Sequence, residues 1–241
     1  MKILFLVIAS ENILYNKLKN YWFNIINNNN NNIDVFFLYN NDNINNNYII
    51  LNNNITFKEK ECYIPGIFNK TINSLKIIDY QKYDFIIRTN LSSYFYIKGL
   101  INFLKTVNTS NIYGPIIKIC KKYDNIRFIV GFCIIISKNK IKYILNNLKN
   151  LENKFKYKFK KYPDDVLFGL IFKELNIKMV EIKNNFINTL EISKIFPDKL
   201  HLLDNKFIIR NRYYYFINGK ADFEKRLKYE IPNIKLITNY I

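Results

Sequence analysis

Two adjacent carboxylates and a short run of hydroxyl and amide side chains carry the most evident capacity for chemistry in this chain. Asp164 and Asp165 follow a proline, and Thr89-Asn90-Leu91-Ser92-Ser93 follows an apolar segment. The single histidine, His201, excludes mechanisms and metal sites that need two, and the sequence has no GxGxxG, P-loop, HExxH or GxSxG motif. Carboxylate and hydroxyl chemistry remains.

The apolar pattern predicts the elements that position these side chains. Residues 3–9, 33–38 and 83–88 are typical of buried strands, and 14–25 and 67–78 have helical spacing. This alternation predicts an α/β fold with a mostly parallel central sheet and helices on both faces. Ligands of such sheets collect at the carboxyl ends of the strands, where we expect Ser10, the 89–93 run and the Asp164-Asp165 segment.

The rest of the chain is interpreted as one domain spanning 1–241. Asparagine-rich stretches at 27–32 and 40–54 are predicted to be surface loops. The later elements expected from the pattern are a helix at 94–104, a strand at 128–137 broken by Gly131, a lysine-rich helix at 138–153, a helix from Pro163 to Leu175, a strand at 177–182 and strand character at 206–216.

Three blocks of sequence resemble GT-A-fold glycosyltransferases. Residues 83–93 resemble the strand-to-loop segment that meets the nucleotide diphosphate, in the RTNLSS version of giant DNA virus enzymes. Residues 128–137 resemble the GxxxxxS strand of fringe-like and β-galactosyltransferase-like enzymes, and 163–169 resemble their [ED]DVxxG segment. The order and spacing of the blocks agree with that fold. The resemblance implies transfer of a sugar from a nucleotide donor, expected to be UDP-linked, to an acceptor hydroxyl with inversion.

The sequence departs from the family at its metal motif. Most GT-A enzymes carry Asp-x-Asp where this chain has Asn90-Leu91-Ser92, and these neutral oxygens could support a weak Mn²⁺ or Mg²⁺ site or none. His201 is a further candidate ligand, because similar enzymes often place a histidine near the C-terminus, although a lone histidine is commonly a surface residue. The basic side chains Arg88 and Lys70 could instead neutralise the leaving diphosphate.

The resemblance implies that an acidic residue at 164–165 is the general base that deprotonates the acceptor. Asp165 is the first candidate and Asp164 the second. Either could instead cap the helix that follows, and two adjacent acids allow one to cap while the other reacts.

Other residues are weaker candidates, each with a plain structural alternative. Gly131 would permit close backbone approach to the sugar or mark a strand irregularity. Ser10 would meet the base or ribose, or lie in an ordinary loop. Thr89 belongs to the expected donor-binding segment, and Arg210 and Arg212 would grip phosphate or line a solvated strand face.

The net charge of +18 would ordinarily suggest a nucleic-acid partner. Because Asn, Ile, Lys, Tyr and Phe are all encoded by A/T-rich codons, codon drift explains much of this charge. Residues 154–161 alternate lysines with aromatics, which indicates a strand that is either a platform for an anionic partner or an edge protected by lysines. Three cysteines without CxxC spacing suit a reducing compartment, so a cytosolic or virion location is expected.

The sequence therefore predicts a glycosyltransferase whose partners are a nucleotide-sugar donor and a glycan or protein acceptor. No apolar run is long enough to span a bilayer. Two alternatives stay open: a protein of the same fold that binds the sugar nucleotide without transfer, and a basic nucleic-acid-binding protein.

Overall fold

The computed structural model describes residues 1–28, 32–188, 206–210, 216–217, 220–221, 224 and 226–232. The described residues belong to two compact units. The first comprises Met1–Ser10, Asn32–Asn90 and Asn108–Lys183, and the second contains the described parts of Glu11–Asn31, Leu91–Val107 and Asn184–Ile241. The prediction of a single domain over the whole chain stays a prediction.

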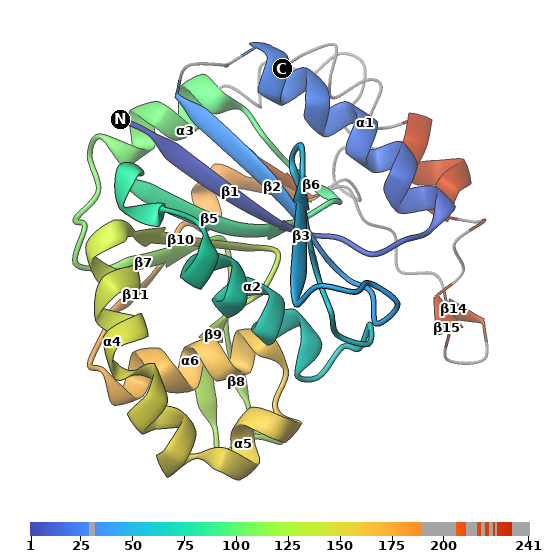
Figure 1. Cartoon of the computed structure of the whole chain (residues 1–241). Helices are drawn as coiled ribbons and strands as arrows, with labels where there is room; N and C mark the ends of the chain where they lie inside the picture. Colours follow the sequence, from blue (N-terminus) through green and yellow to red (C-terminus); the bar gives the residue numbers. More distant parts are fainter. Residues whose placement is uncertain are drawn as a thin grey trace. The chain divides into compact units, whose positions relative to one another are not determined.

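An eight-stranded sheet in the order β11-β7-β10-β5-β1-β2-β4-β3 forms the centre of the first unit (Figure 1). Its strands are β1 (Ile3–Ile8), β2 (Ile33–Asn40), β3 (Tyr48–Leu51), β4 (Asn54–Phe57), β5 (Phe85–Asn90), β7 (Ile112–Gly114), β10 (Cys133–Ser137) and β11 (Met179–Glu181). Strand β1 is parallel to both β2 and β5, whereas β10 is antiparallel to β5. The predicted α/β class with a large central sheet is confirmed.

The helices of the first unit pack on the sheet through one large apolar cluster. The helices are α2 (Gly66–Ile77), α4 (Lys138–Lys154), α5 (Lys156–Lys161) and α6 (Asp164–Glu174), with a 3₁₀ turn, η1 (Tyr80–Lys82). Leu4 and Leu6 of β1 share this cluster with Phe168 and Phe172 of α6. Since Ile3–Val7 are all buried, β1 has the apolar surroundings on both faces that its sequence predicts.

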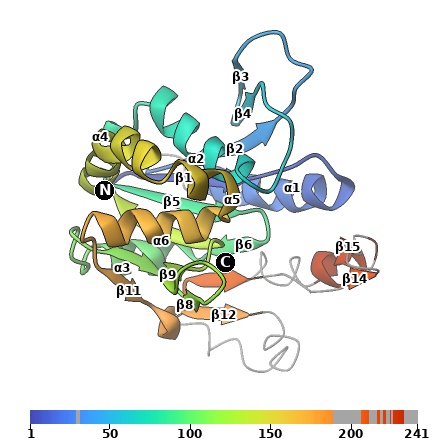
Figure 2. The same ribbon diagram turned by 90° about the horizontal axis from the view of Figure 1, so that it is seen from below.

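A two-stranded ribbon accompanies α6. It consists of β8 (Ile117–Cys120) and β9 (Ile126–Ile129), which pair antiparallel. Figure 2 shows β9 beside α6. The predicted strand at 128–137 is thus two strands, β9 and β10, with Gly131 in the turn between them.

The second unit contains α1 (Ile13–Asn28), α3 (Ile97–Leu104) and short strands. These are β6 (Ser93–Phe95), β12 (Phe186–Asn188), β13 (Ile208–Arg210), β14 (Phe216–Ile217) and β15 (Lys220–Ala221), with a 3₁₀ turn, η2 (Lys183–Asn185), at its boundary. Strand β13 lies between β12 and β6. The predicted helix at 94–104 begins later than expected because Tyr94 and Phe95 pair with β13. Helices on both faces of the central sheet stay a prediction, since α1 and α3 belong to this other unit.

The two asparagine-rich stretches are not simply loops. Helix α1 continues through Asn28, and residues 29–31 lie outside the described part. The second stretch contains β3 and the start of β4, joined by a turn in which Asn52 adopts a φ of 53°. Asparagine tolerates this left-handed conformation better than most residues, so the tract supplies hairpin turn residues. The hairpin extends away from the rest of the first unit (Figure 2).

The prediction of a strand over 154–161 is wrong. Helix α4 ends at Lys154, and helix α5 begins at Lys156. Phe155 and Phe159, four residues apart, pack against the apolar cluster, whereas Tyr157 is 64% exposed. Spacing by four places both phenylalanines on one helical face, and this burial outweighs the period-two pattern of lysines.

Gly169 allows α6 to approach the β8–β9 ribbon closely. A Cβ atom at this position would lie 2.4 Å from the Arg127 carbonyl oxygen and 2.7 Å from the Phe128 Cβ. We expect Gly169→Ala to destabilise the fold by about 1–3 kcal/mol, although alanine is the better helix former by up to about 1 kcal/mol. Urea unfolding measures this, with Asn150→Ala on the exposed face of α4 as the control. Equal stability of Gly169→Ala and the parent would contradict the close contact.

Candidate active site

The carboxyl ends of three neighbouring strands meet at one edge of the central sheet. Ile8 of β1 pairs with Asn90 of β5 on one side and with Leu38 of β2 on the other. Strand β2 continues to Asn40. This is the edge at which the sequence predicted a ligand site.

A buried ion pair joins β5, one of these three strands, to α6. Arg88 Nη2 on β5 donates to Asp164 Oδ2 at the first position of α6. Both side chains are 5% exposed. Removing one partner from such a pair would leave an uncompensated buried charge, so the pair holds the start of α6 against the end of β5.

Asp165 lies beside this pair and has backbone partners. Its carboxylate accepts hydrogen bonds from the Gly131 N–H at 3.3 Å and from the Val166 N–H at 2.9 Å. A Cβ atom on Gly131 would lie 2.9 Å from Arg88 Nη1 and 3.2 Å from Asp165 Cβ. The missing side chain of Gly131 thus lets the β9–β10 turn reach both residues.

The surroundings of Asp165 favour the protonated form of its carboxyl group. Burial raises the pKa of Asp165 to about 6, and the Asp164 carboxylate acts in the same direction. The Arg88 guanidinium and the hydrogen bonds from Gly131 and Val166 oppose the rise in pKa. A carboxylate with a pKa near 6 is mostly ionised at pH 7 and still binds a proton readily, as a general base requires.

The structure separates the two acids more clearly than their sequence positions do. The helix begins at Asp164 and has Pro163 at its cap position, without a side-chain capping bond. Neither acid is therefore the N-cap. Asp164 is engaged by Arg88, whereas Asp165 is only half-buried. The two carboxylates therefore differ in exposure and in that Asp164 is held directly by a cation.

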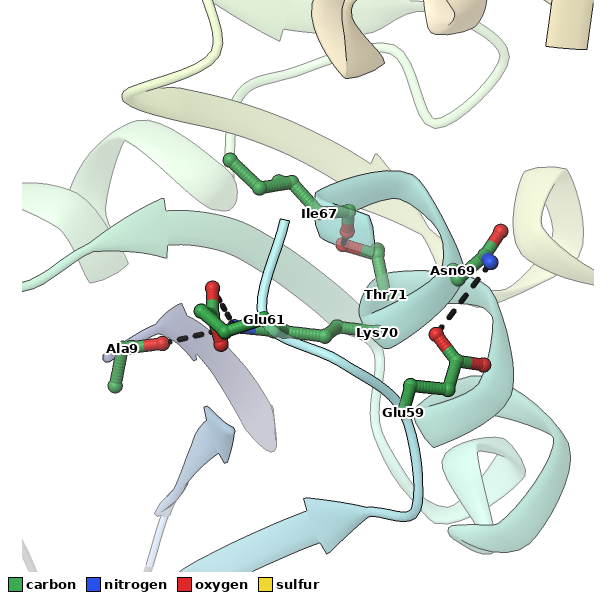
Figure 3. A network of polar contacts seen from close by, with 7 residues as sticks. All are labelled: Ala9, Glu59, Glu61, Ile67, Asn69, Lys70 and Thr71. Carbon is green, nitrogen blue, oxygen red and sulfur yellow. Dashed lines mark hydrogen bonds and ion pairs between the residues drawn. The ribbon is translucent and has the colours of Figure 1, made fainter. Parts of the chain in front are cut away.

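Lys70 forms a second polar cluster at the same edge (Figure 3). Its side chain is fully buried, and Nζ donates to the Ala9 carbonyl oxygen at 3.0 Å and to the two Glu61 oxygens at 2.8 and 2.7 Å. Burial lowers the pKa of Lys70, and the bond and charge of Glu61 partly offset this effect. Lys70 therefore ties α2 to the end of β1 and to the segment before the helix.

Asn40 is a polar residue at this edge that the sequence did not single out. It is the last residue of β2, and its side chain is 7% exposed. Neither its amide nitrogen nor its amide oxygen has a hydrogen-bond partner among the described residues. Buried amides are normally satisfied, so this one is available to a ligand. Its place at the start of an asparagine-rich stretch concealed it, and its position two residues after a predicted strand was the only signal.

The other predicted donor-binding residues divide between two settings. Ser10 follows β1 at the sheet edge, and Asn90 ends β5 on the same strand face as Arg88. Thr89 points to the opposite face, where its hydroxyl donates to the Phe132 carbonyl oxygen at 2.7 Å. Ser92 is buried and belongs to the second unit.

The C-terminal candidates are only partly described. Arg210 is buried in the second unit, and its Nη1 donates to Ser93 Oγ at 3.0 Å, so it does not lie on a solvated strand face. His201 and Arg212 lie outside the described residues.

The described side chains at this edge do not form a carboxylate site for a divalent cation. No group of three His, Cys, Asp or Glu residues gathers within the described ranges. Asn90 offers a neutral oxygen, and Asp164 is already engaged by a guanidinium.

Comparison with known proteins places the fold. No family model matches the chain, and no curated protein is similar to it in sequence. A glycosyltransferase involved in glycosylation of the major capsid of PBCV-1 matches 98% of this chain and 100% of its own, with a TM-score of 0.57 and 10% identity. The galactosyltransferase LgtC, in complex with donor and acceptor sugar analogues, matches 97% and 96%, with a TM-score of 0.50 and 14% identity.

A further structure, the glycosyltransferase GlyE of Streptococcus pneumoniae, matches 99% of this chain but 62% of its own, with a TM-score of 0.52 and 14% identity. The chain therefore has the GT-A glycosyltransferase fold, as the resemblance implied. The finer likeness to fringe-like enzymes stays a prediction. No helix within the described residues has the length and apolar character needed to cross a membrane.

The raised pKa of Asp165 predicts a pH-dependent change in stability for Asp165→Asn. The pKa of Asp165 is about 6 in the folded state and 3.8 in the unfolded state, so the folded state binds the proton more tightly. The free energy of unfolding therefore falls as the pH rises from about 4 through about 6. Asp165→Asn has no ionisable group at this position and therefore does not lose this stability at high pH. We expect it to be more stable than the parent by about 1–2 kcal/mol at pH 8, a magnitude reduced because the group is half-buried.

Denaturant unfolding at pH 4 and pH 8 tests this expectation, with Asp42→Asn in an exposed turn as the matched control. The gain should disappear at pH 4, where the parental carboxyl group is protonated. A variant less stable than the parent at pH 8 would mean that the charged form of Asp165 is favoured by its surroundings.

Proposed function

We propose that this protein is a glycosyltransferase that moves a sugar from a nucleotide-sugar donor to an acceptor hydroxyl, with Asp165 as the general base. The observation that carries this proposal is the half-buried Asp165 carboxylate at the carboxyl edge of a GT-A sheet, with a pKa of about 6. Its neighbour Asp164 is neutralised by Arg88, so one carboxylate supports the structure while the other accepts the proton.

In this mechanism the acceptor oxygen attacks the anomeric carbon of the donor as its proton passes to Asp165. The bond from that carbon to the diphosphate oxygen breaks, and the nucleoside diphosphate leaves with the bonding electrons. Attack opposite the leaving group inverts the configuration at the anomeric carbon. The Gly131 N–H, which donates to Asp165, orients the carboxylate for this transfer. Inversion and a UDP-linked donor are the expectations that come from the sequence resemblance.

The cations of the site differ in their availability to the leaving diphosphate. Arg88 is paired with a carboxylate that is itself buried, whereas the Glu61 partner of Lys70 is 43% exposed. A diphosphate at this edge would therefore displace Glu61 from Lys70 more readily than Asp164 from Arg88. The unsatisfied Asn40 amide offers the N–H donors of its NH2 group and a carbonyl acceptor to a heterocyclic base.

The general-base role predicts a large loss of transfer in Asp165→Asn. The asparagine keeps the shape of the side chain but cannot accept a proton at neutral pH, so we expect the rate of transfer to fall by about 10²–10⁴-fold. Release of nucleoside diphosphate from a panel of nucleotide sugars, with and without simple glycosides as acceptors, identifies the donor first. Asp42→Asn is the control for the same chemical change at an exposed position.

The pH profile gives a second readout of the same role. For the parent, log kcat/KM should rise with pH up to about 6 and then level off, because the base must be ionised in the free enzyme. Parental rates in Asp165→Asn would place the base elsewhere. A donor that stabilises the protein thermally but is never turned over by the parent would favour the binding protein without transfer.

Metal dependence is expected to be weak because the neutral Asn90 replaces a carboxylate of the usual metal motif. Chelation should therefore leave most of the transfer rate, and Asn90→Asp should bind Mn²⁺ more tightly than the parent. Titration with Mn²⁺ and rates with EDTA measure the two effects. Complete loss of transfer in EDTA, with recovery on adding Mn²⁺, would show that a cation is required.

A further inference from the structure

A strongly basic surface of the first unit is not used by the proposed reaction. The β8–β9 hairpin, Ile117–Ile129, and helix α5, Lys156–Lys161, form this surface, which we call the basic tip. The two segments contain eight lysine or arginine residues and one acid, Asp124. Figure 1 shows α5 close to the ends of β8 and β9.

Contacts through Asp124 hold the two segments of the basic tip together. The Asp124 carboxylate accepts hydrogen bonds from Lys158 Nζ at 2.6 Å and from the Tyr162 hydroxyl at 2.9 Å. The rings of Tyr123 and Tyr162 are 4.5 Å apart between centroids. The only acid of the surface is thus used within it. In the described part of the chain, no other cation of the tip pairs with a carboxylate.

The basic tip also exposes large apolar side chains. Ile119 on β8 and Tyr157 on α5 are each 64% exposed. Ile119 pairs with Arg127 across the hairpin, and Lys161 Nζ lies 4.1 Å from the centroid of the Tyr157 ring. Each segment of the basic tip therefore exposes one large apolar side chain next to a cation.

We propose that the basic tip docks on the surface of an anionic lipid bilayer. The partner is identified by charge complementarity, because an unpaired cluster of cations is attracted to a negatively charged leaflet. The tyrosine ring suits the headgroup region, and the isoleucine side chain reaches the boundary of the acyl chains. This inference is independent of the proposed sugar transfer.

The composition of the tip favours a bilayer over a nucleic acid. Seven of its eight cations are lysines, and Arg127 is the single arginine. Arginine binds phosphate groups in fixed bidentate geometry, whereas lysines act as flexible point charges that suit the diffuse field of a lipid surface. Nucleic-acid binding would also leave the exposed aliphatic Ile119 without a role.

Sedimentation of the full chain with vesicles tests the proposal. One set of vesicles contains phosphatidylcholine alone, and the other contains phosphatidylcholine with about one third phosphatidylserine. We expect binding to the second set only, weakening as salt is added. Binding to neither set, or equally to both, overturns the proposal.

Two triple variants with the same change in net charge locate the surface. Lys121→Gln with Lys122→Gln and Lys160→Gln should weaken vesicle binding on the order of 100-fold. The control changes three lysines that are exposed outside the tip, Lys142, Lys149 and Lys178, to glutamine. Equal losses in the two triple variants would assign binding to overall charge and overturn the proposal.

A separate variant tests the apolar contribution, with thermal melting of every variant to confirm folding. Ile119→Ser with Tyr157→Ser should weaken binding about tenfold without changing its salt dependence. Ile50→Ser on β3 is the control, since Ile50 is 48% exposed in a segment without charged residues from Asn43 to Phe57. Unchanged affinity in the double variant, or tighter binding of the parent to duplex DNA than to the anionic vesicles, would refute a bilayer partner.

Discussion

The arrangement at the carboxyl edge of the central sheet depends on the buried ion pair between Arg88 and Asp164. With both side chains 5% exposed, neither charge has water as an alternative partner, so separating them would be strongly unfavourable. The pair links a central strand to the first residue of α6 and thereby holds the start of the helix against the end of β5. Asp165 is carried to its position by the same contact. The pKa of Asp165 is raised by burial and by the nearby negative charge of Asp164. The direct hydrogen bond from Arg88 goes to Asp164.

The chain has a net charge of +18, but the two cations described at the candidate site have carboxylate partners. Arg88 and Lys70 are both buried there, and each is paired with a carboxylate. These two cations are therefore balanced by neighbouring carboxylates, whereas Lys158 is the one cation of the basic tip with a carboxylate partner among the described residues. If a donor binds at this edge as proposed, it meets cations that already have carboxylate partners, rather than a concentration of unpaired positive charge.

The sequence predicted the framework better than the side-chain partners. Strands with continuous aliphatic runs, such as β1, and helices with regular spacing, such as α2 and α4, were found because burial of one face or both leaves a direct periodic signal. The helix at 156–161 was missed because its buried aromatic residues alternate locally with lysines. Residues 164–165 were singled out from the resemblance, with Asp165 ranked before Asp164. The ion pair of Asp164 was not predicted, because its partner Arg88 lies 76 positions away in the chain. Asn40 was missed because a single sequence does not indicate that the start of α2 will cover the end of β2 and bury this side chain.

The bias toward residues with A/T-rich codons makes important residues hard to recognise in the sequence. Asparagine and lysine occur both where the structure needs them and where codon drift alone would place them. Asparagine fills long tracts, yet within one tract Asn52 makes a left-handed turn, the Asn53 amide donates to the Val35 carbonyl oxygen at 2.8 Å, and Asn40 is buried without a partner. Lysine shows the same contrast between Lys70, which is fully buried, and the exposed lysines of α5. Burial of an ionised or amide group costs free energy that drift alone would not sustain. In a chain of biased composition, burial therefore distinguishes the residues that the fold requires from those that merely accumulate at its surface.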